Sequence, residues 1–158
     1  MVGALAWQFA FTPGVGFVNR WLESDTAWLS SRGTSLVVII ATEVWKTTPF
    51  IALLLLAGLA TVPHNLTEAA KVDGATAWQA FSRVTLPNMR NAIIVAVLFR
   101  SLDAFRVFDT IYIQTRGANN TESVSILGYN QLINRLNLGV GSAVSVLIFV
   151  CVVLIAVG

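Results

Sequence analysis

The stretch at residues 138–158 most constrains the fold, because it carries no charged side chain. A membrane-spanning helix needs about 20 mostly apolar residues to cross about 30 Å of hydrocarbon. Of the 158 residues of the chain, 56% are hydrophobic and only 11% are charged, against roughly 25% charged in soluble domains. A soluble domain of this size cannot hide so much apolar side-chain surface from water. We therefore expect an all-α membrane protein, folded as a polytopic helical bundle.

Two further stretches, at about residues 36–60 and 92–113, have the length of a span but contain charges. Those charged residues are Glu43, Lys46, Arg100, Asp103, Arg106 and Asp109. With about 138–158 they give three predicted spans in a single transmembrane domain over 1–158. Before them, residues 1–22 read as the stub of an earlier span followed by a segment at the membrane surface, and 23–35 as a polar loop. We interpret the chain as a fragment of a longer protein.

Several kinds of chemistry lack the residues they need. The chain has one cysteine, Cys151, and one histidine, His64, so it offers neither an internal disulfide nor a set of metal ligands, and no nucleophile–base pair stands out. Its basic residues are scattered, which argues against a nucleic-acid partner. The G-x-x-x-x-G-K-[ST] loop that cradles nucleotide phosphates is absent from the sequence, so we expect no ATP site here.

The loop at about residues 61–90 is polar but patterned. Thr67 is placed to cap the start of a short helix, and Asp73 and Gly74 indicate a turn. A second helix is predicted over about 75–84, and Pro87 is predicted to end it. Taken alone, this pattern also suits a plain helix–turn–helix linker between two spans.

The spacing within that loop resembles the EAA loop of permease subunits of bacterial ABC importers, in the branch that carries sugars. The matching residues are Glu68, Ala69, Ala70, Gly74, Val84, Leu86 and Pro87. Similarity extends along the chain, through Trp45, Pro49, Phe50, the run Ala57-Gly58-Leu59, Val62, Pro63, Phe108, Asp109, Thr115, Gly117 and residues 139–142. Residues 115–137 look closest to the trehalose-importer permeases of actinobacteria. One departure is Gly117-Ala118-Asn119, where the family often has Gly-Gly-Pro.

The resemblance implies that the loop is cytoplasmic and couples the permease to an ABC ATPase dimer. The implied coupling residues are Glu68, Ala69, Ala70, Asp73, Gly74, Trp78, Phe81, Leu86 and Pro87. Small alanines let a helix approach a partner closely, and glycine permits a turn that a side chain would obstruct. ATP and Mg²⁺ would then sit on the partner ATPase, with no cofactor on this chain, which would be a transport subunit and not an enzyme. The other implied partners are a second permease subunit, an extracytoplasmic sugar-binding protein and the lipid bilayer, in a multi-pass protein of the bacterial plasma membrane.

Two helix faces in the predicted spans carry polar groups that a sugar could meet. A charged side chain at the bilayer centre costs about 2.5–3.5 kcal/mol on insertion scales, so it usually faces a cavity or a partner. By resemblance, the substrate path is lined by Glu43, Lys46, Thr47, Arg100, Asp103, Ala104 and Val107. Candidate stacking or gating rings are Phe105, Phe108 and Tyr112. The alternative is that the charges form structural pairs, and Glu43 and Lys46 are spaced to pair with each other.

These observations predict a sugar-translocating ABC permease, for a disaccharide such as trehalose. Two alternatives stay open. One is a permease for another solute, such as glycerol phosphate or an oligosaccharide. The other is a membrane scaffold with no transport role, which predicts that the loop could be altered without loss of function.

Overall fold

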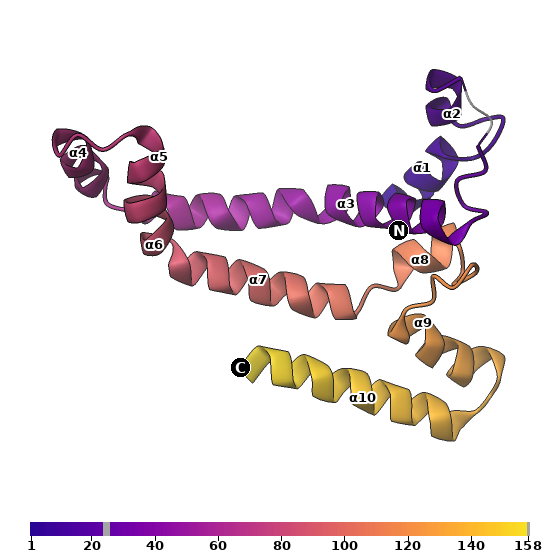
Figure 1. Ribbon diagram of the computed structural model, residues 1–158. Coiled ribbons are helices and arrows are strands. Elements are labelled where there is room, and N and C mark those ends of the chain that lie inside the picture. The colour runs from indigo at the N-terminus through magenta and orange to yellow at the C-terminus, as the bar shows by residue number, and fades with distance from the viewer. Residues whose placement is uncertain (24–25, 158) are drawn as a thin grey trace. The chain divides into compact units, whose positions relative to one another are not determined.

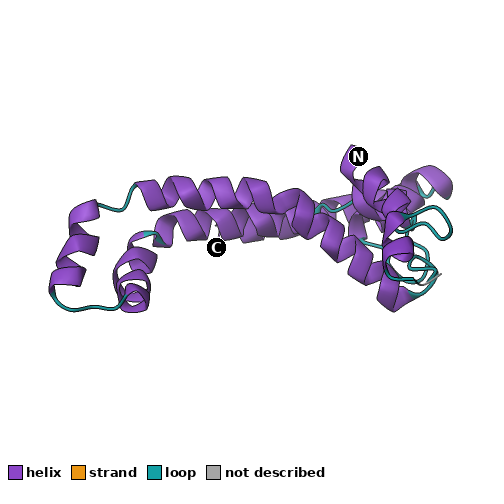
Figure 2. Cartoon of the chain, turned by 90° about the horizontal axis from the view of Figure 1, so that it is seen from above, coloured by secondary structure: helices purple, strands orange, loops and turns teal. Residues whose placement is uncertain are grey.

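A computed structural model describes residues 1–23 and 26–157. Within them the chain forms helices joined by turns and loops, with no β-strand (Figure 2). The all-α prediction is confirmed. In chain order the elements are α1 (Val2–Ala10), α2 (Phe17–Trp21), α3 (Arg32–Ala60), α4 (His64–Val72), α5 (Ala77–Ala80), the π-helical turn η1 (Phe81–Thr85), α6 (Leu86–Asn88), α7 (Arg90–Phe105), α8 (Asp109–Gln114), α9 (Val124–Tyr129), the π-helical turn η2 (Asn130–Asn134) and α10 (Leu138–Val157).

Two of the described helices are long and apolar enough to cross a membrane, over Arg32–Ala60 and Leu138–Ala156. The predicted stretch at 92–113 is divided instead, because α7 ends at Phe105 and α8 begins at Asp109. Phe108, just before α8, has a backbone outside the helical region, with φ −132° and ψ −58°. The polar loop predicted over 23–35 is shortened, since α3 begins at Arg32; residues 24–25 lie outside the described residues.

The chain divides into two compact units, which we describe separately. The first comprises Met1–Thr47 and Leu102–Gly158, and the second comprises Thr48–Ser101. In the second unit, the last part of α3 lies alongside the first part of α7 (Figures 1 and 2). Gly58 makes this approach possible, because a Cβ atom there would lie only 2.3 Å from the Cβ of Ala92. Phe50 and Phe99 pack edge to face across the same two helices, with ring centroids 6.1 Å apart.

The first unit has a small apolar core and an unusual number of buried polar side chains. Ile39, Ile111 and Ile126 form the core. Buried beside it are Ser35, Thr42, Glu43, Thr110 and Gln114. In a bilayer, where lipid is as apolar as leucine, hydrogen bonds between helices help to hold them together. The polar side chains therefore have a packing role as well as any role in transport.

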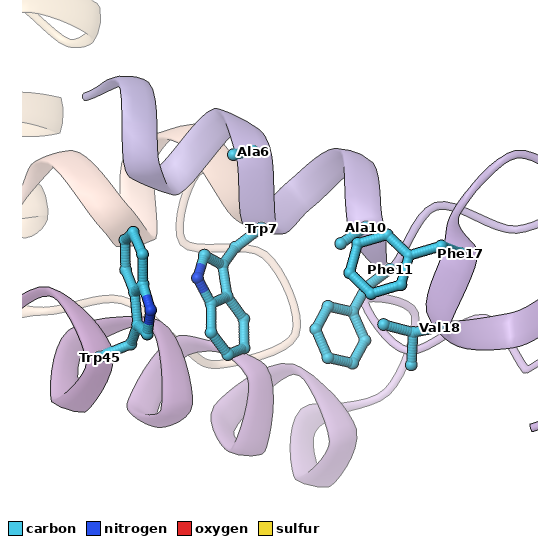
Figure 3. Close-up of a pocket in the computed structure, with 7 residues that line it drawn as sticks. All are labelled: Ala6, Trp7, Ala10, Phe11, Phe17, Val18 and Trp45. Carbon is cyan, nitrogen blue, oxygen red and sulfur yellow. The ribbon is translucent and has the colours of Figure 1, made fainter. Parts of the chain in front are cut away.

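Helix α1 packs against α3 through aromatic rings in the first unit. Trp7 of α1 lies between Trp45 of α3 and Phe11, with ring centroids 6.1 Å and 5.7 Å away (Figure 3). Phe11 in turn packs edge to face against Trp28 at 5.6 Å. The rings of Trp7, Phe11 and Trp45 also line an apolar cavity of about 380 Å³ (Figure 3). Residues 1–22, predicted as a span stub and a surface segment, form α1 and α2 around it.

The helix α10 is almost entirely exposed within this chain, which suits contact with lipid or with other helices. Its first turns pack on α9 and η2. A Cβ atom at Gly141 would lie 2.4 Å from Cγ of Leu132, and one at Gly128 would lie 3.3 Å from Cγ1 of Val144. Glycine at these positions lets the two segments approach closely.

Candidate coupling loop and substrate path

The first helix of the predicted coupling loop begins earlier than its sequence suggests. α4 starts at His64 directly after Pro63, so the prediction of Thr67 as N-cap is wrong. Proline already has the φ of about −65° that a helix start needs, which favours initiation here. The Thr67 hydroxyl instead donates back to the carbonyl of His64 at 2.7 Å, inside the first turn. Glu68 Oε1 lies 3.2 Å from Nδ1 of His64, one turn away.

The predicted turn at Asp73 and Gly74 ends α4 in a Schellman motif. The amide of Ala75 donates to the carbonyl of Ala70 at 2.9 Å, and that of Gly74 donates to Lys71 at 3.1 Å. This pair of bonds requires a left-handed residue after the helix end. Gly74 supplies it with φ +79°. A Cβ atom at Gly74 would meet nothing within 4 Å, so backbone conformation and not crowding explains the glycine.

The second helix of the loop starts with a capping box. The hydroxyl of Thr76 accepts from the amide of Gln79, and the Gln79 side chain accepts from the amide of Thr76. This reciprocal pair satisfies two amides that a helix start leaves without partners. The predicted helix over 75–84 therefore begins at Ala77 and passes into the π-helical turn η1 after Ala80.

Pro87 does not end the helical path as predicted, because it lies inside α6. Proline has no amide to donate to the carbonyl four residues earlier. Two other hydrogen bonds form beside Pro87. The amide of Leu86 reaches Phe81 in a wider π-helical turn, and the Asn88 side chain donates to the carbonyl of Val84 at 2.7 Å. Such π-turns recur at functional sites.

The predicted coupling residues gather on this helix–turn–helix, which Figure 1 shows as α4, α5 and α6. Small residues form its inner side, where Ala70 and Ala80 are buried. A cavity of about 280 Å³ opens there, lined by Ala70, Asp73, Gly74, Ala75, Gln79, Ala80, Arg83 and Val84. On the outside Trp78 is 74% exposed and packs against Phe81 with ring centroids 5.8 Å apart. A wide aromatic surface exposed on a polar loop is suited to docking.

In the predicted substrate path, Lys46 lies within hydrogen-bond distance of three acceptors. Its Nζ atom lies 2.8 Å from Glu43 Oε1, 3.2 Å from Asp109 Oδ1 and 3.2 Å from Thr110 Oγ1. An ammonium group has three N–H donors, so each donor has an acceptor. The predicted pairing of Glu43 with Lys46 is present, and Glu43 is only 5% exposed. Thr47, the third residue predicted on this face, donates its hydroxyl proton to the carbonyl of Glu43 at 2.7 Å.

The partners of this pair come from α8, and sequence reasoning missed Thr110 among them. The fully buried Thr110 donates to Glu43 Oε1 and accepts from Lys46. Gln114, one turn further on, donates to the hydroxyl of Thr42 at 2.7 Å. Asp109 Oδ2 also lies 3.1 Å from the amino group of Met1. The sequence prediction gives Thr110 no role and ends its span at about residue 113, so it does not place Thr110 and Gln114 on one helix.

The predicted polar face on α7 is interrupted by the helix break. Arg100, Asp103 and Ala104 lie within α7, whereas Val107 lies beyond its end at Phe105. The turn that closes α7 bonds the amide of Arg106 to the carbonyl of Asp103 at 3.1 Å. Val107 therefore no longer continues the helical phase of Arg100, and the four residues do not form one regular face.

Two of the three predicted stacking rings belong to an aromatic cluster made by Phe108, Tyr112 and Tyr129. Phe108 and Tyr112 are stacked at 5.2 Å, and Tyr129 meets both edge on at 5.3 Å and 5.5 Å. A side-chain hydrogen bond with Tyr112 raises the pKa of Tyr129. Phe105, the third ring, is 43% exposed at the end of α7.

The fold of this chain has counterparts among solved structures. Two crystal structures of a bacterial ABC transporter for the acidic polysaccharide alginate match it with TM-scores of 0.89 and 0.88. In both, 99% of this chain and 57% of the matched chain are covered, at 23% and 24% sequence identity. At that identity the likeness shows the fold.

The family follows from the sequence, since residues 1–158 match the family described as binding-protein-dependent transport system inner membrane component, and the chain belongs to it. It is 55% identical over 156 residues to the trehalose transport system permease protein SugA of Mycobacterium tuberculosis, covering 99% of this chain and 51% of that protein. It is 40% identical over 158 residues to the trehalose/maltose transport system permease protein MalF of Thermococcus litoralis, covering 96% and 53%. The chain thus spans about half the length of the curated relatives it matches.

Proposed function

We propose that this chain is part of the transmembrane subunit of an ABC importer and forms part of the translocation path for a sugar, most simply a disaccharide such as trehalose. Family membership supports the transport class. The relatives named for trehalose and for trehalose with maltose, at 55% and 40% identity, support the sugar. The observation that carries the proposal is the Schellman turn at Gly74, which joins two short helices of the predicted coupling loop.

In this proposal the loop docks on a cytoplasmic ABC ATPase dimer. Trp78 and Phe81 present an exposed aromatic surface beside the small residues Ala70 and Gly74. Aromatic side chains are enriched among the residues that dominate binding energy at interfaces. ATP and Mg²⁺ bind the ATPase, and this chain hydrolyses nothing itself. With the loop inside the cell, α3 runs inward and α10 runs inward again.

The translocation path in this proposal includes the ion pair of the buried Glu43 and the half-buried Lys46 on α3. Sugars are held by carboxylates, amides and charged forks with apolar or aromatic surface nearby. The aromatic cluster of Phe108, Tyr112 and Tyr129 provides such surface in the same unit. A second permease subunit completes the path, and an extracytoplasmic binding protein delivers the sugar.

The test is co-purification of the full-length permease with the products of its neighbouring genes from detergent. The wild type is compared with a Glu68→Ala/Gly74→Val double variant. A matched control, Glu122→Ala/Gly33→Ala, changes the same residue types outside the coupling loop. We expect an ABC ATPase with the wild type and the control, and a loss of it from the loop variant. Absence of any ATPase from the wild-type complex would favour the scaffold alternative.

A further inference from the structure

We propose that Thr110 is a positioning residue of the sugar path, which fixes the geometry in which Glu43 and Lys46 meet the sugar. The inference rests on the proposed function, because it assumes that this pair lines the path. Thr110 itself is fully buried. It acts through its two charged neighbours.

The argument begins with the bonding capacity of one hydroxyl group. A threonine hydroxyl has one proton to donate and two lone pairs to accept with. Thr110 uses both functions on the same ion pair, since it donates to Glu43 Oε1 and accepts from Lys46 Nζ at 3.2 Å. It therefore bridges the carboxylate and the ammonium, which also contact each other at 2.8 Å. The three groups form a closed triangle.

Removing the hydroxyl would take one hydrogen-bond partner from each of the two charged side chains. Lys46 would keep two acceptors, Glu43 and Asp109, for its three donors, and Glu43 Oε1 would lose one of its donors. A buried charged group without its hydrogen bonds is strongly destabilised, so the side chains turn toward other partners. The Glu43 and Lys46 side chains would then leave the arrangement that the sugar meets.

The local fold places Thr110 at this point. α8 is separated from α7 by residues 106–108, so the helical phase of α7 does not set its orientation. Ile111, the next residue, packs in the core with Ile39 of α3. Gln114, one turn on, bonds to Thr42 of α3. These two side chains, which both follow Thr110 in α8, hold α8 against α3 and direct the hydroxyl to the pair.

The experiment measures uptake of radiolabelled trehalose by the complete importer, with the full-length permease, in proteoliposomes. Thr110→Val keeps the shape of the side chain and removes the hydroxyl, and Thr110→Ser keeps the hydroxyl. Thr121→Val is the matched control, because Thr121 is also buried but bonds to Ala118 and Thr115 and not to the ion pair or to α3. Glu43→Gln tests the path itself. All rates are normalised to the permease present in the membrane.

We expect Thr110→Val to lose about tenfold in Vmax/KM, with KM raised, as for loss of one hydrogen bond to a charged group. We expect Thr110→Ser to recover KM and Thr121→Val to leave it unchanged. Unchanged kinetics in Thr110→Val, with altered kinetics in Glu43→Gln, overturn the positioning role alone. Unchanged kinetics in Glu43→Gln overturn the proposed path and the positioning role with it. If Thr110→Val does not reach the membrane, Thr110→Ala takes its place in the same comparison.

Discussion

The hydroxyl of Ser123 donates a hydrogen bond of 2.9 Å to the carbonyl oxygen of Val107. The same hydroxyl accepts from the amide of Ile126 at 3.3 Å and so caps the start of α9. Ser125 supports it by donating to the carbonyl of Phe105 at 3.3 Å. Main-chain carbonyls freed by a break inside a membrane need other donors. Hydroxyls of the following loop provide them here, which makes the break between α7 and α8 a stable feature.

Ser123→Ala should destabilise the protein by about 1–2 kcal/mol, because it removes a helix cap and a donor to a main-chain carbonyl. Thermal unfolding of the purified full-length permease in detergent measures the effect. Ser123→Thr keeps the hydroxyl and should unfold close to the wild-type temperature. Equal unfolding temperatures for the alanine variant and the wild type would show that the bond contributes nothing.

Gly58→Leu should prevent α3 and α7 from packing in the second unit, since its Cβ would lie 2.3 Å from the Cβ of Ala92. We expect a loss of more than about 3 kcal/mol, beyond ordinary overpacking, seen as aggregation in size-exclusion chromatography. Gly33→Ala is the control, because Gly33 is also in α3 but has nothing within 4 Å of its Cβ position. Monodisperse Gly58→Leu protein would contradict the close approach of the two helices.

At Gly74 the nature of the substitution should decide the effect. The left-handed backbone costs an ordinary L-residue about 1–2 kcal/mol, while asparagine tolerates it better. Gly74→Val should therefore insert normally but lose sugar-stimulated ATPase activity in the reconstituted importer, and Gly74→Asn should keep more of it. Normal stimulation in Gly74→Val would contradict the coupling role of the turn.

Asp103→Ala should alter the affinity for the sugar or the rate of its transport, if the polar residues of α7 line the path as predicted. Uptake of radiolabelled trehalose over a range of concentrations separates KM from Vmax. Unaltered values would place Asp103 among the structural charges of the helix. A matched control is Asp73→Ala, which removes the same side chain from the coupling loop and should leave KM for the sugar unchanged.

Thr42 and Gln114 should contribute to stability as a coupled pair, because they share one hydrogen bond. Thr42→Val leaves the buried Nε2 of Gln114 without its acceptor at 2.7 Å, which should cost about 1–3 kcal/mol. Gln114→Leu removes the amide altogether, and the double variant should be more stable than Thr42→Val alone. A double-mutant cycle of unfolding temperatures gives the coupling energy. Strictly additive effects would show that the two side chains do not interact.

The turn in the predicted coupling loop was readable from sequence because its signal is local. Gly74 indicates the left-handed turn by its residue type, and the predicted pairing of Glu43 with Lys46 follows from their spacing on one helix. Pro87 misled the prediction because the helical path continues through it, from the π-helical turn η1 into α6. The rule that proline ends a helix does not take account of a π-helical turn just before the proline.

The helix break was not readable, because its stabilising groups lie far along the chain. Ser123 is 16 residues from the carbonyl that it serves, and Ser125 is 20 residues from its own. Nothing in residues 92–113 themselves requires an interruption. Once the helix is broken its phase restarts, which brings Thr110 against Glu43 and takes Val107 out of the predicted face. The missed site residues therefore follow from one long-range interaction.

Because α10 is apolar on all sides, contact with lipid does not favour any one rotation of the helix about its axis. A helix with a polar side settles at one angle in the bilayer, whereas 138–157 offers lipid much the same surface in every direction. Steric fit must choose the angle instead, and close fits to η2 and α9 occur at Gly141 against Leu132 and at Val144 against Gly128. Gly141 of α10 and Gly128 of α9 therefore set the rotation of α10 about its own axis. Substituting either should turn the helix about its axis without changing how deeply it sits in the membrane.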